Sequence, residues 1–176
     1  MKRLQVIGIG NRIMGDDGIG VYVVEELIKQ QFLYNIESVA GKTDINIEYA
    51  VGESEIIIEY VLGETDIDYC LDRLDKKSLV IIIDAAMTGK EPGTVTEFTI
   101  YDMSLCTSML FSIHNHNIIE AARMMLNHCC FTIIGIEPEI VDYRFGMSDT
   151  LNISFPNIME DVEKCLLKIA RQQQRK

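Results

Sequence analysis

Short runs of apolar residues alternate along the chain with longer segments in which apolar residues recur at helical spacing. The first run, Leu4 to Ile9, predicts a strand, and Val21 to Gln30 has the spacing of an amphipathic helix. Leu79 to Ile83 are five consecutive apolar residues, four of them β-branched, which is typical of a central strand buried on both faces. The same patterns predict strands at 34–40, 94–100 and 131–136, and helices at 66–74, at 118–126 and at about 158–169.

This alternation predicts an α/β fold: a doubly wound three-layer sandwich, in which a twisted, mostly parallel sheet of five or six strands has helices on both faces. At 176 residues we expect a single α/β domain, 1–176. One internal repeat interrupts the alternation: DINIEYAVGESE is followed eleven residues later by EIIIEYVLGETD. We expect segment 43–61 to be an inserted hairpin whose removal leaves the fold intact.

The composition narrows the class of partner. The net charge of -11 argues against nucleic acid or an anionic membrane. No apolar run approaches the roughly 18 residues of a membrane span, and no signal peptide is visible. The five cysteines contain no C-x-x-C pair and are interpreted as reduced thiols of a cytoplasmic protein.

The glycine-rich turn after the first strand carries the first candidate chemistry. Gly8 and Gly10 begin a dinucleotide-binding fingerprint, but the position of its third glycine is Ile13. Asp16 and Asp17 in the same loop would repel a pyrophosphate. A carboxylate pair at the end of a strand is better suited to a cation.

Polar side chains follow three predicted strand ends or loops that should converge at one edge of the sheet. These are Asp16-Asp17, Asp84 after the central strand, and His114 or His116 at the start of a helix. Two oxygens and one imidazole nitrogen can bind nickel, iron or zinc, and three protein ligands leave positions open for exchange. The alternatives are structural: Asp84 as a loop cap, and the histidines as helix caps or surface residues. No G-x-S-x-G elbow is present, and Cys106 with His114 lacks a recognisable activating setting.

Five segments in order resemble one family: GIGNRIMGDDGIG, IIIDAA, EPGTV, SIHNHNIIEAARMM and GIEPE. Together they resemble the hydrogenase maturation proteases, endopeptidases that remove a C-terminal extension from the large subunit of nickel-iron hydrogenases. The resemblance covers the chain from Arg3 to about Leu167, except for the repeat.

The resemblance implies that Asp17, Asp84 and His114 are the catalytic and metal-binding residues; His114 fits the family histidine better than His116. It also implies that nickel is supplied by the substrate, so that the protein has no resident organic cofactor. The partner would be the hydrogenase large-subunit precursor, cut after nickel insertion. The metal would polarise the scissile carbonyl or a water, and Asp16 is a candidate base.

This sequence departs from the family near the substrate. Segment 43–61 lies just upstream of the family's G-T loop, for which Gly63-Glu64-Thr65 is the nearest match. The insertion could determine the partner or form a homodimer by strand addition. Two other functions stay open: a protease of the same fold that acts on another precursor, such as a spore protein, and a non-catalytic metal- or partner-binding module.

Overall fold

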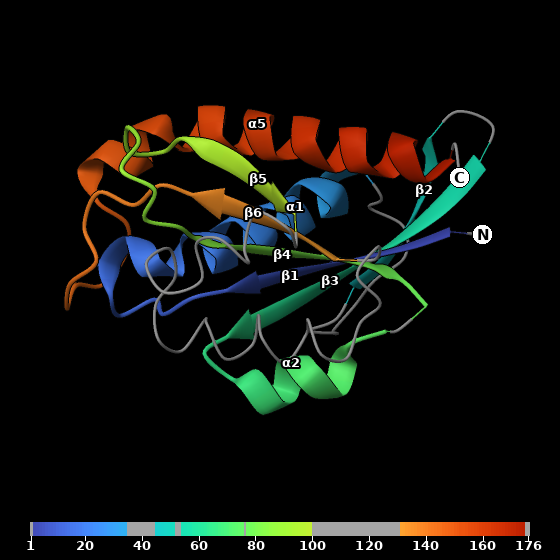
Figure 1. The fold of residues 1–176 in the computed structure, drawn as a ribbon, viewed down its shortest axis with the longest axis horizontal. Coiled ribbons are helices and arrows are strands. Elements are labelled where there is room, and N and C mark those ends of the chain that lie inside the picture. Colours follow the sequence, from blue (N-terminus) through green and yellow to red (C-terminus); the bar gives the residue numbers. More distant parts are fainter. Residues whose placement is uncertain (1, 35–44, 52–53, 76, 100–130, 175–176) are drawn as a thin grey trace.

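A computed structural model describes residues 2–34, 45–51, 54–75, 77–99 and 131–174 (Figure 1). Its strands form one six-stranded sheet in the order β2-β3-β1-β4-β6-β5. The strands are β1 (Lys2–Ile9), β2 (Ile45–Val51), β3 (Ser54–Glu64), β4 (Leu79–Ala85), β5 (Val95–Thr99) and β6 (Phe131–Ile136). The helices are the 3-10 helix η1 (Gly15–Gly18) and the α-helices α1 (Ile19–Tyr34), α2 (Ile67–Arg73) and α5 (Asp149–Gln174).

The centre of the sheet is parallel and its two borders are antiparallel. β1 pairs in parallel with both β3 and β4, and β4 pairs in parallel with β6. β2 runs antiparallel to β3, and β5 antiparallel to β6. The predicted mostly parallel α/β sheet is therefore confirmed.

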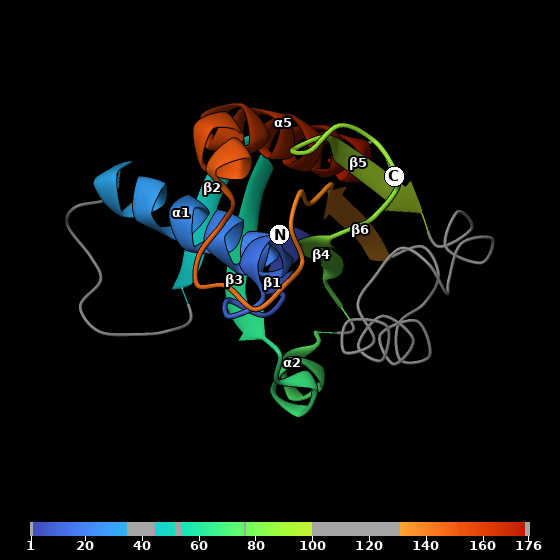
Figure 2. The same ribbon diagram turned by 90° about the vertical axis from the view of Figure 1, so that its left-hand side faces the viewer.

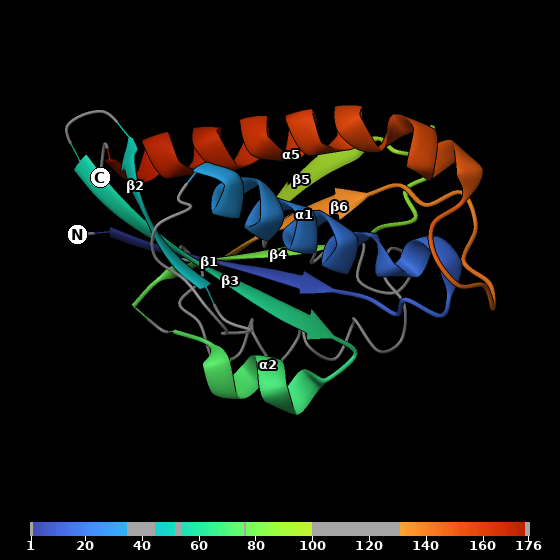
Figure 3. The same cartoon turned by 180° about the vertical axis from the view of Figure 1, so that it is seen from behind.

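Strand alternation builds a separate apolar core on each face of the sheet. In β4, Ile81 and Ile83 pack with α1 and α5, whereas Val80 and Ile82 pack with residues of α2. Figure 2 shows α1 and α5 on one side of the sheet and α2 on the other, and Figure 3 shows α1 and α5 together from behind. This layering explains why the strand 79–83 is apolar without interruption.

The repeat forms two unequal strands. β2 and β3 are an antiparallel pair in which Val51 is opposite Ser54, as the expected hairpin requires. β3, however, also pairs with β1 along its length, and Tyr60 and Val61 are buried at 1% and 0% exposure. The second arm of the expected hairpin is thus a core strand, which argues against the expectation that 43–61 can be removed without loss of the fold.

Two helix boundaries also differ from the sequence prediction. α1 continues to Tyr34, where we expected a strand at 34–40 to begin; residues 35–40 lie outside the described part. α5 starts at Asp149 instead of about 158 and contains Pro156. Its start is stabilised by Ser148, whose hydroxyl accepts a hydrogen bond from the backbone N–H of Leu151 at 3.2 Å.

None of the described helices combines the length and the apolar character needed to span a membrane.

Candidate functional site

The parallel strands end at one edge of the sheet, and the loops that follow them gather there. These are the turn after β1 with η1, the loop after β4 and the loop from β6 to α5; Figure 2 looks onto this edge. In open α/β sheets, this edge is where ligands bind.

Two glycines allow η1 and α1 to pack closely against the strand ends. Gly10 has a φ of 129°, and a Cβ there would lie 1.9 Å from the backbone oxygen of Asp17. A Cβ at Gly20 would lie 2.1 Å from the backbone oxygen of Ile83. The glycine pattern of the first loop therefore sets how closely the turn with Asp17 approaches the strand with Asp84.

The structure brings the elements of two predicted site residues together. η1, which contains Asp17, contacts β4, which contains Asp84. Asp17 is 6% exposed, and its Oδ2 accepts a hydrogen bond from the backbone N–H of Asn11 at 2.9 Å. Asp84 is fully buried, and its Oδ1 accepts from the N–H of Ala85 at 2.8 Å. Both carboxylates are thus oriented by backbone N–H groups at the ligand-binding edge.

The predicted third ligand lies outside the described residues, as does the alternative. Neither His114 nor His116 is therefore placed relative to the two aspartates. Within the described ranges, no group of three or more His, Cys, Asp and Glu side chains could hold a metal ion. The two carboxylates supply hard oxygen donors, which fit a divalent ion when an imidazole completes the set.

Asp16 is held very differently from Asp17. It is fully buried, and Oδ2 accepts hydrogen bonds from the N–H groups of Glu139 and Ile140, both at 2.9 Å. Oδ1 accepts from the N–H of Ser148 at 2.6 Å. These three bonds fasten the β6–α5 loop to the turn after β1. Asp16 is therefore a structural link between loops and is poorly placed to act as a base.

Glu137 makes a second link, which the sequence reasoning missed. Its carboxylate accepts hydrogen bonds from the hydroxyl and N–H of Thr88 and from the N–H of Gly89. Burial would raise the pKa of the Glu137 carboxyl, but these hydrogen bonds outweigh it and lower that pKa. Its position in the sequence could have indicated this role, because Glu137 directly follows β6, just as Asp84 lies at the end of β4.

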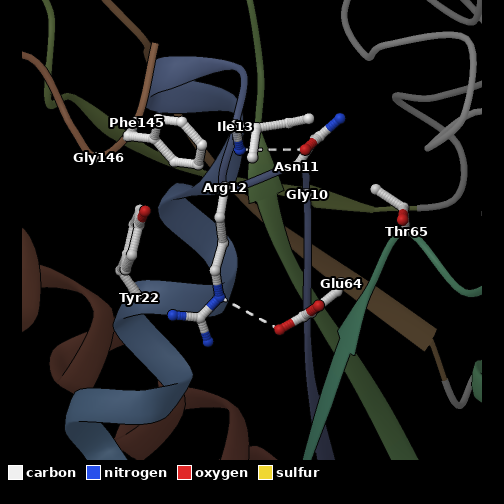
Figure 4. Close-up of a pocket in the computed structure, with 9 residues that line it drawn as sticks. All are labelled: Gly10, Asn11, Arg12, Ile13, Tyr22, Glu64, Thr65, Phe145 and Gly146. Atoms are coloured by element: carbon white, nitrogen blue, oxygen red, sulfur yellow. Dashed lines mark hydrogen bonds and ion pairs between the residues drawn. The ribbon is translucent and has the colours of Figure 1, made fainter.

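A pocket of about 530 Å³ opens beside the turn that carries Asp17. It lies between the turn after β1, the start of α1, the end of β3 and the β6–α5 loop (Figure 4). Its described lining is Gly10, Asn11, Arg12, Ile13, Tyr22, Glu64, Thr65, Phe145 and Gly146. Glu64 and Thr65 belong to the segment predicted to correspond to a substrate-contacting loop.

A family model and individual relatives match this chain in sequence, and their descriptions agree with one another. The family model described as hydrogenase maturation protease matches residues 50–165. A Methanocaldococcus jannaschii protein assigned by name to this group is 32% identical over 156 residues, which cover 81% of this chain and 76% of the relative. A second protein from the same organism, with the same assignment, is 26% identical and covers 95% of this chain and 91% of the relative.

Solved structures share the fold. The hydrogenase-maturating endopeptidase HybD of Escherichia coli has a TM-score of 0.66 at 22% identity, covering 94% of this chain and 93% of its own. HybD of Thermococcus kodakarensis, a [NiFe] hydrogenase maturation protease, has a TM-score of 0.66 at 19% identity, covering 93% of this chain and 98% of its own.

Proposed function

Since this chain belongs to the hydrogenase maturation protease family, we propose that it is an endopeptidase that removes the C-terminal extension of a nickel-iron hydrogenase large-subunit precursor after nickel insertion. The observation that carries the proposal is the pair Asp17 and Asp84. Each is buried at the ligand-binding edge and each is oriented by a backbone N–H. Distant parts of the chain thus supply two oxygen donors to one edge of the sheet.

In this proposal, nickel is part of the substrate and the protein recognises it. Asp17, Asp84 and His114 would be its ligands, with no resident organic cofactor. Three protein ligands suit an ion that arrives with its own ligands from the precursor, because positions stay open. A precursor without nickel would lack this anchor and would remain uncut.

The contacts of Asp16 bear on which group activates the scissile carbonyl or the attacking water. Its carboxylate is fully buried and already accepts hydrogen bonds from three backbone N–H groups, so an attacking water has poor access to it. The proposal therefore assigns activation of the scissile carbonyl or of the water to the metal-bound centre.

The net charge and the free thiols agree with a protein partner in the cytoplasm, which is part of the proposal. A net charge of -11 repels polyanions such as nucleic acid. The described cysteines, Cys70 and Cys165, are free thiols, as expected in a reducing compartment. β2 is the last strand of the described sheet order, so a homodimer through its outer edge is part of the proposal.

The first prediction concerns cleavage of the nickel-loaded precursor. Asp84→Asn and His114→Ala should each slow cleavage by at least about 100-fold, since each alters a proposed ligand of the nickel that would position the scissile bond. The melting temperature should stay close to that of the wild type. The measurement is a time course of precursor shortening on a denaturing gel.

The matched control is Glu139→Gln, which alters an exposed acid at the same edge. It should cleave at the wild-type rate. Wild-type cleavage rates for Asp84→Asn would overturn the assignment of the site. Rapid cleavage of a nickel-free precursor by the wild-type protein would instead overturn nickel recognition and leave the peptidase assignment standing.

A further inference from the structure

We propose that the side-chain amide of Asn11 is a further catalytic group, which donates a hydrogen bond to the oxygen of the scissile carbonyl as that oxygen gains negative charge. The inference rests on the proposed function, because the precursor supplies the carbonyl. It adds a catalytic residue beside the three proposed nickel ligands.

The turn after β1 engages three of the four hydrogen-bonding groups of Asn11. Its backbone N–H donates to Oδ2 of Asp17 at 2.9 Å, and its backbone oxygen accepts from the N–H of Met14 at 3.0 Å. Its side-chain oxygen, Oδ1, accepts from the N–H of Ile13 at 3.1 Å. These bonds hold the backbone of Asn11 and orient its side chain.

The fourth group, the Nδ2 amide, has its N–H bonds left for a ligand. Among the described residues, none accepts a hydrogen bond from it. Ile13 determines which end of the side chain is oxygen, because a backbone N–H requires an acceptor. Figure 4 shows the side-chain oxygen directed at the backbone nitrogen of Ile13 and the amide nitrogen pointing away from it.

The turn itself does not require an amide at this position. A side-chain bond to the backbone N–H two residues on is made equally well by Asp and, more weakly, by Ser. What distinguishes Asn from both is the pair of N–H donors at the end of its side chain. Asn11 is half-buried and its backbone contacts a proposed nickel ligand. The chain therefore carries, beside that ligand, donors that the turn does not use.

Covalent geometry places this amide within reach of the proposed reaction. Nδ2 is separated by four bonds from the backbone nitrogen of Asn11, so the two atoms are at most about 5 Å apart. That backbone nitrogen lies 2.9 Å from Oδ2 of Asp17. The amide is therefore within roughly 8 Å of the Asp17 carboxylate, a distance that a metal-bound carbonyl and one hydrogen bond can span.

The chemistry of hydrolysis explains why a neutral donor is useful at this edge. The oxygen of water bonds to the carbonyl carbon, and the carbonyl oxygen gains the displaced electron pair. The carbon–nitrogen bond then breaks, and the leaving amine takes up the proton that the water gives up. The carboxylates of Asp17 and Asp84 oppose the charge on the carbonyl oxygen, whereas N–H donors that are already oriented stabilise it. Asn11 exchanges no proton in this step.

Arg12, the neighbouring cation, is already engaged. Its guanidinium is 2.9 Å from a carboxylate oxygen of Glu25 and 3.2 Å from one of Glu64. It also lies over the Tyr22 ring, 5.1 Å from the centroid. A negative oxygen would have to displace a glutamate to reach it, so the amide of Asn11 is the better donor.

The test compares two variants that keep the turn and lose the amide. Asn11→Asp and Asn11→Ser each offer an oxygen to the N–H of Ile13, and neither places an N–H donor at the position of Nδ2. The first variant adds a charge and the second does not, so a shared effect cannot come from charge. The backbone N–H that orients Asp17 is present in both.

Cleavage of the nickel-loaded precursor is measured in a single turnover, with the protease in excess. Both variants should lower the rate at saturating protease by at least about 100-fold, which is the loss expected when one donor to the oxyanion is removed. The protease concentration that gives half of this rate should change less than about threefold, since the bond forms mainly in the transition state. The melting temperature should stay close to that of the wild type.

The matched control is Asn157→Asp, which makes the same substitution at an exposed position of α5. It should cleave at the wild-type rate. A wild-type rate in either variant of Asn11 would overturn its catalytic role and leave the peptidase assignment standing. So would an effect confined to the half-saturating concentration. A wild-type protein that cuts no nickel-loaded precursor would overturn the proposed function, and the role of Asn11 with it.

Discussion

Asp16 and Asp17 are adjacent acids whose carboxylates have different hydrogen-bond partners. The Asp16 carboxylate is fully buried and accepts three backbone hydrogen bonds from residues more than 120 positions away. The Asp17 carboxylate accepts one from its own turn, at Asn11, and the helix η1 that contains Asp17 contacts the strand of Asp84. A carboxylate that satisfies three buried N–H groups contributes to stability, since those donors would otherwise be left unpaired.

Asp16→Asn should therefore lower the free energy of unfolding by roughly 2–4 kcal/mol, because an amide offers one acceptor oxygen to three donors. Urea denaturation gives the measurement, with the exposed Asp142→Asn as a control expected to stay within about 0.5 kcal/mol of the wild type. Under conditions where both proteins are folded, precursor cleavage should fall less than about tenfold. A general base would cost about 10²–10⁴-fold, and a loss of that size in folded protein would restore Asp16 as the base.

At the scale of elements, the two strands of the repeat have separate roles. β3 lies between β2 and β1 and supplies Tyr60 and Val61 to the two cores. β2 lies at the border of the described sheet. The second copy of the repeat is thus part of the core sheet, and the first copy extends it by one strand.

Tyr60→Ala should lower the free energy of unfolding by about 3–5 kcal/mol, since it empties a fully packed aromatic site. Ile153→Ala removes an apolar side chain that is 82% exposed on α5, and should change stability by less than about 0.5 kcal/mol. Thermal or urea unfolding compares the two. A Tyr60→Ala effect as small as that of Ile153→Ala would show that β3 is peripheral.

At the scale of the whole molecule, two buried carboxylates join three loops at the ligand-binding edge. Asp16 holds the β6–α5 loop to the turn after β1, and Glu137 holds the start of that same loop to the loop after β4. Asp84 stands at the end of β4, just before the loop that Glu137 holds. The edge is therefore ordered by long-range hydrogen bonds in addition to the sheet itself.

Glu137 should make stability depend on pH. Its pKa is lower in the folded protein than its ordinary value of about 4.5, so the unfolded chain binds the proton more readily. Its contribution is complete above pH 4.5 and is lost as the pH falls from there through the folded pKa. Glu137→Gln should be less stable than the wild type at pH 7, and the difference should shrink below pH 4.5. Urea titrations at a series of pH values measure this difference in the free energy of unfolding. A difference that does not change with pH would show that the charge of Glu137 does not contribute to stability.

The sequence by itself was enough to predict most of the elements and the edge of the sheet at which we propose the site. Uninterrupted apolar runs specify strands buried on both faces; Asp84 stands where one such run ends, and Asp17 lies in the loop that follows another. The order of segments also identified the family. These features are local, so the spacing of neighbouring residues is enough to reveal them.

Only the tertiary structure separated the surroundings of the two neighbouring acids. Asp16 and Asp17 are equivalent in a local pattern, and they differ because the donors to Asp16 come from the far end of the chain. The pocket likewise joins four separate segments, and β3 was recognisable as a core strand only through its pairing with β1. Contacts between residues far apart in sequence depend on how all the elements pack together, which no local pattern encodes.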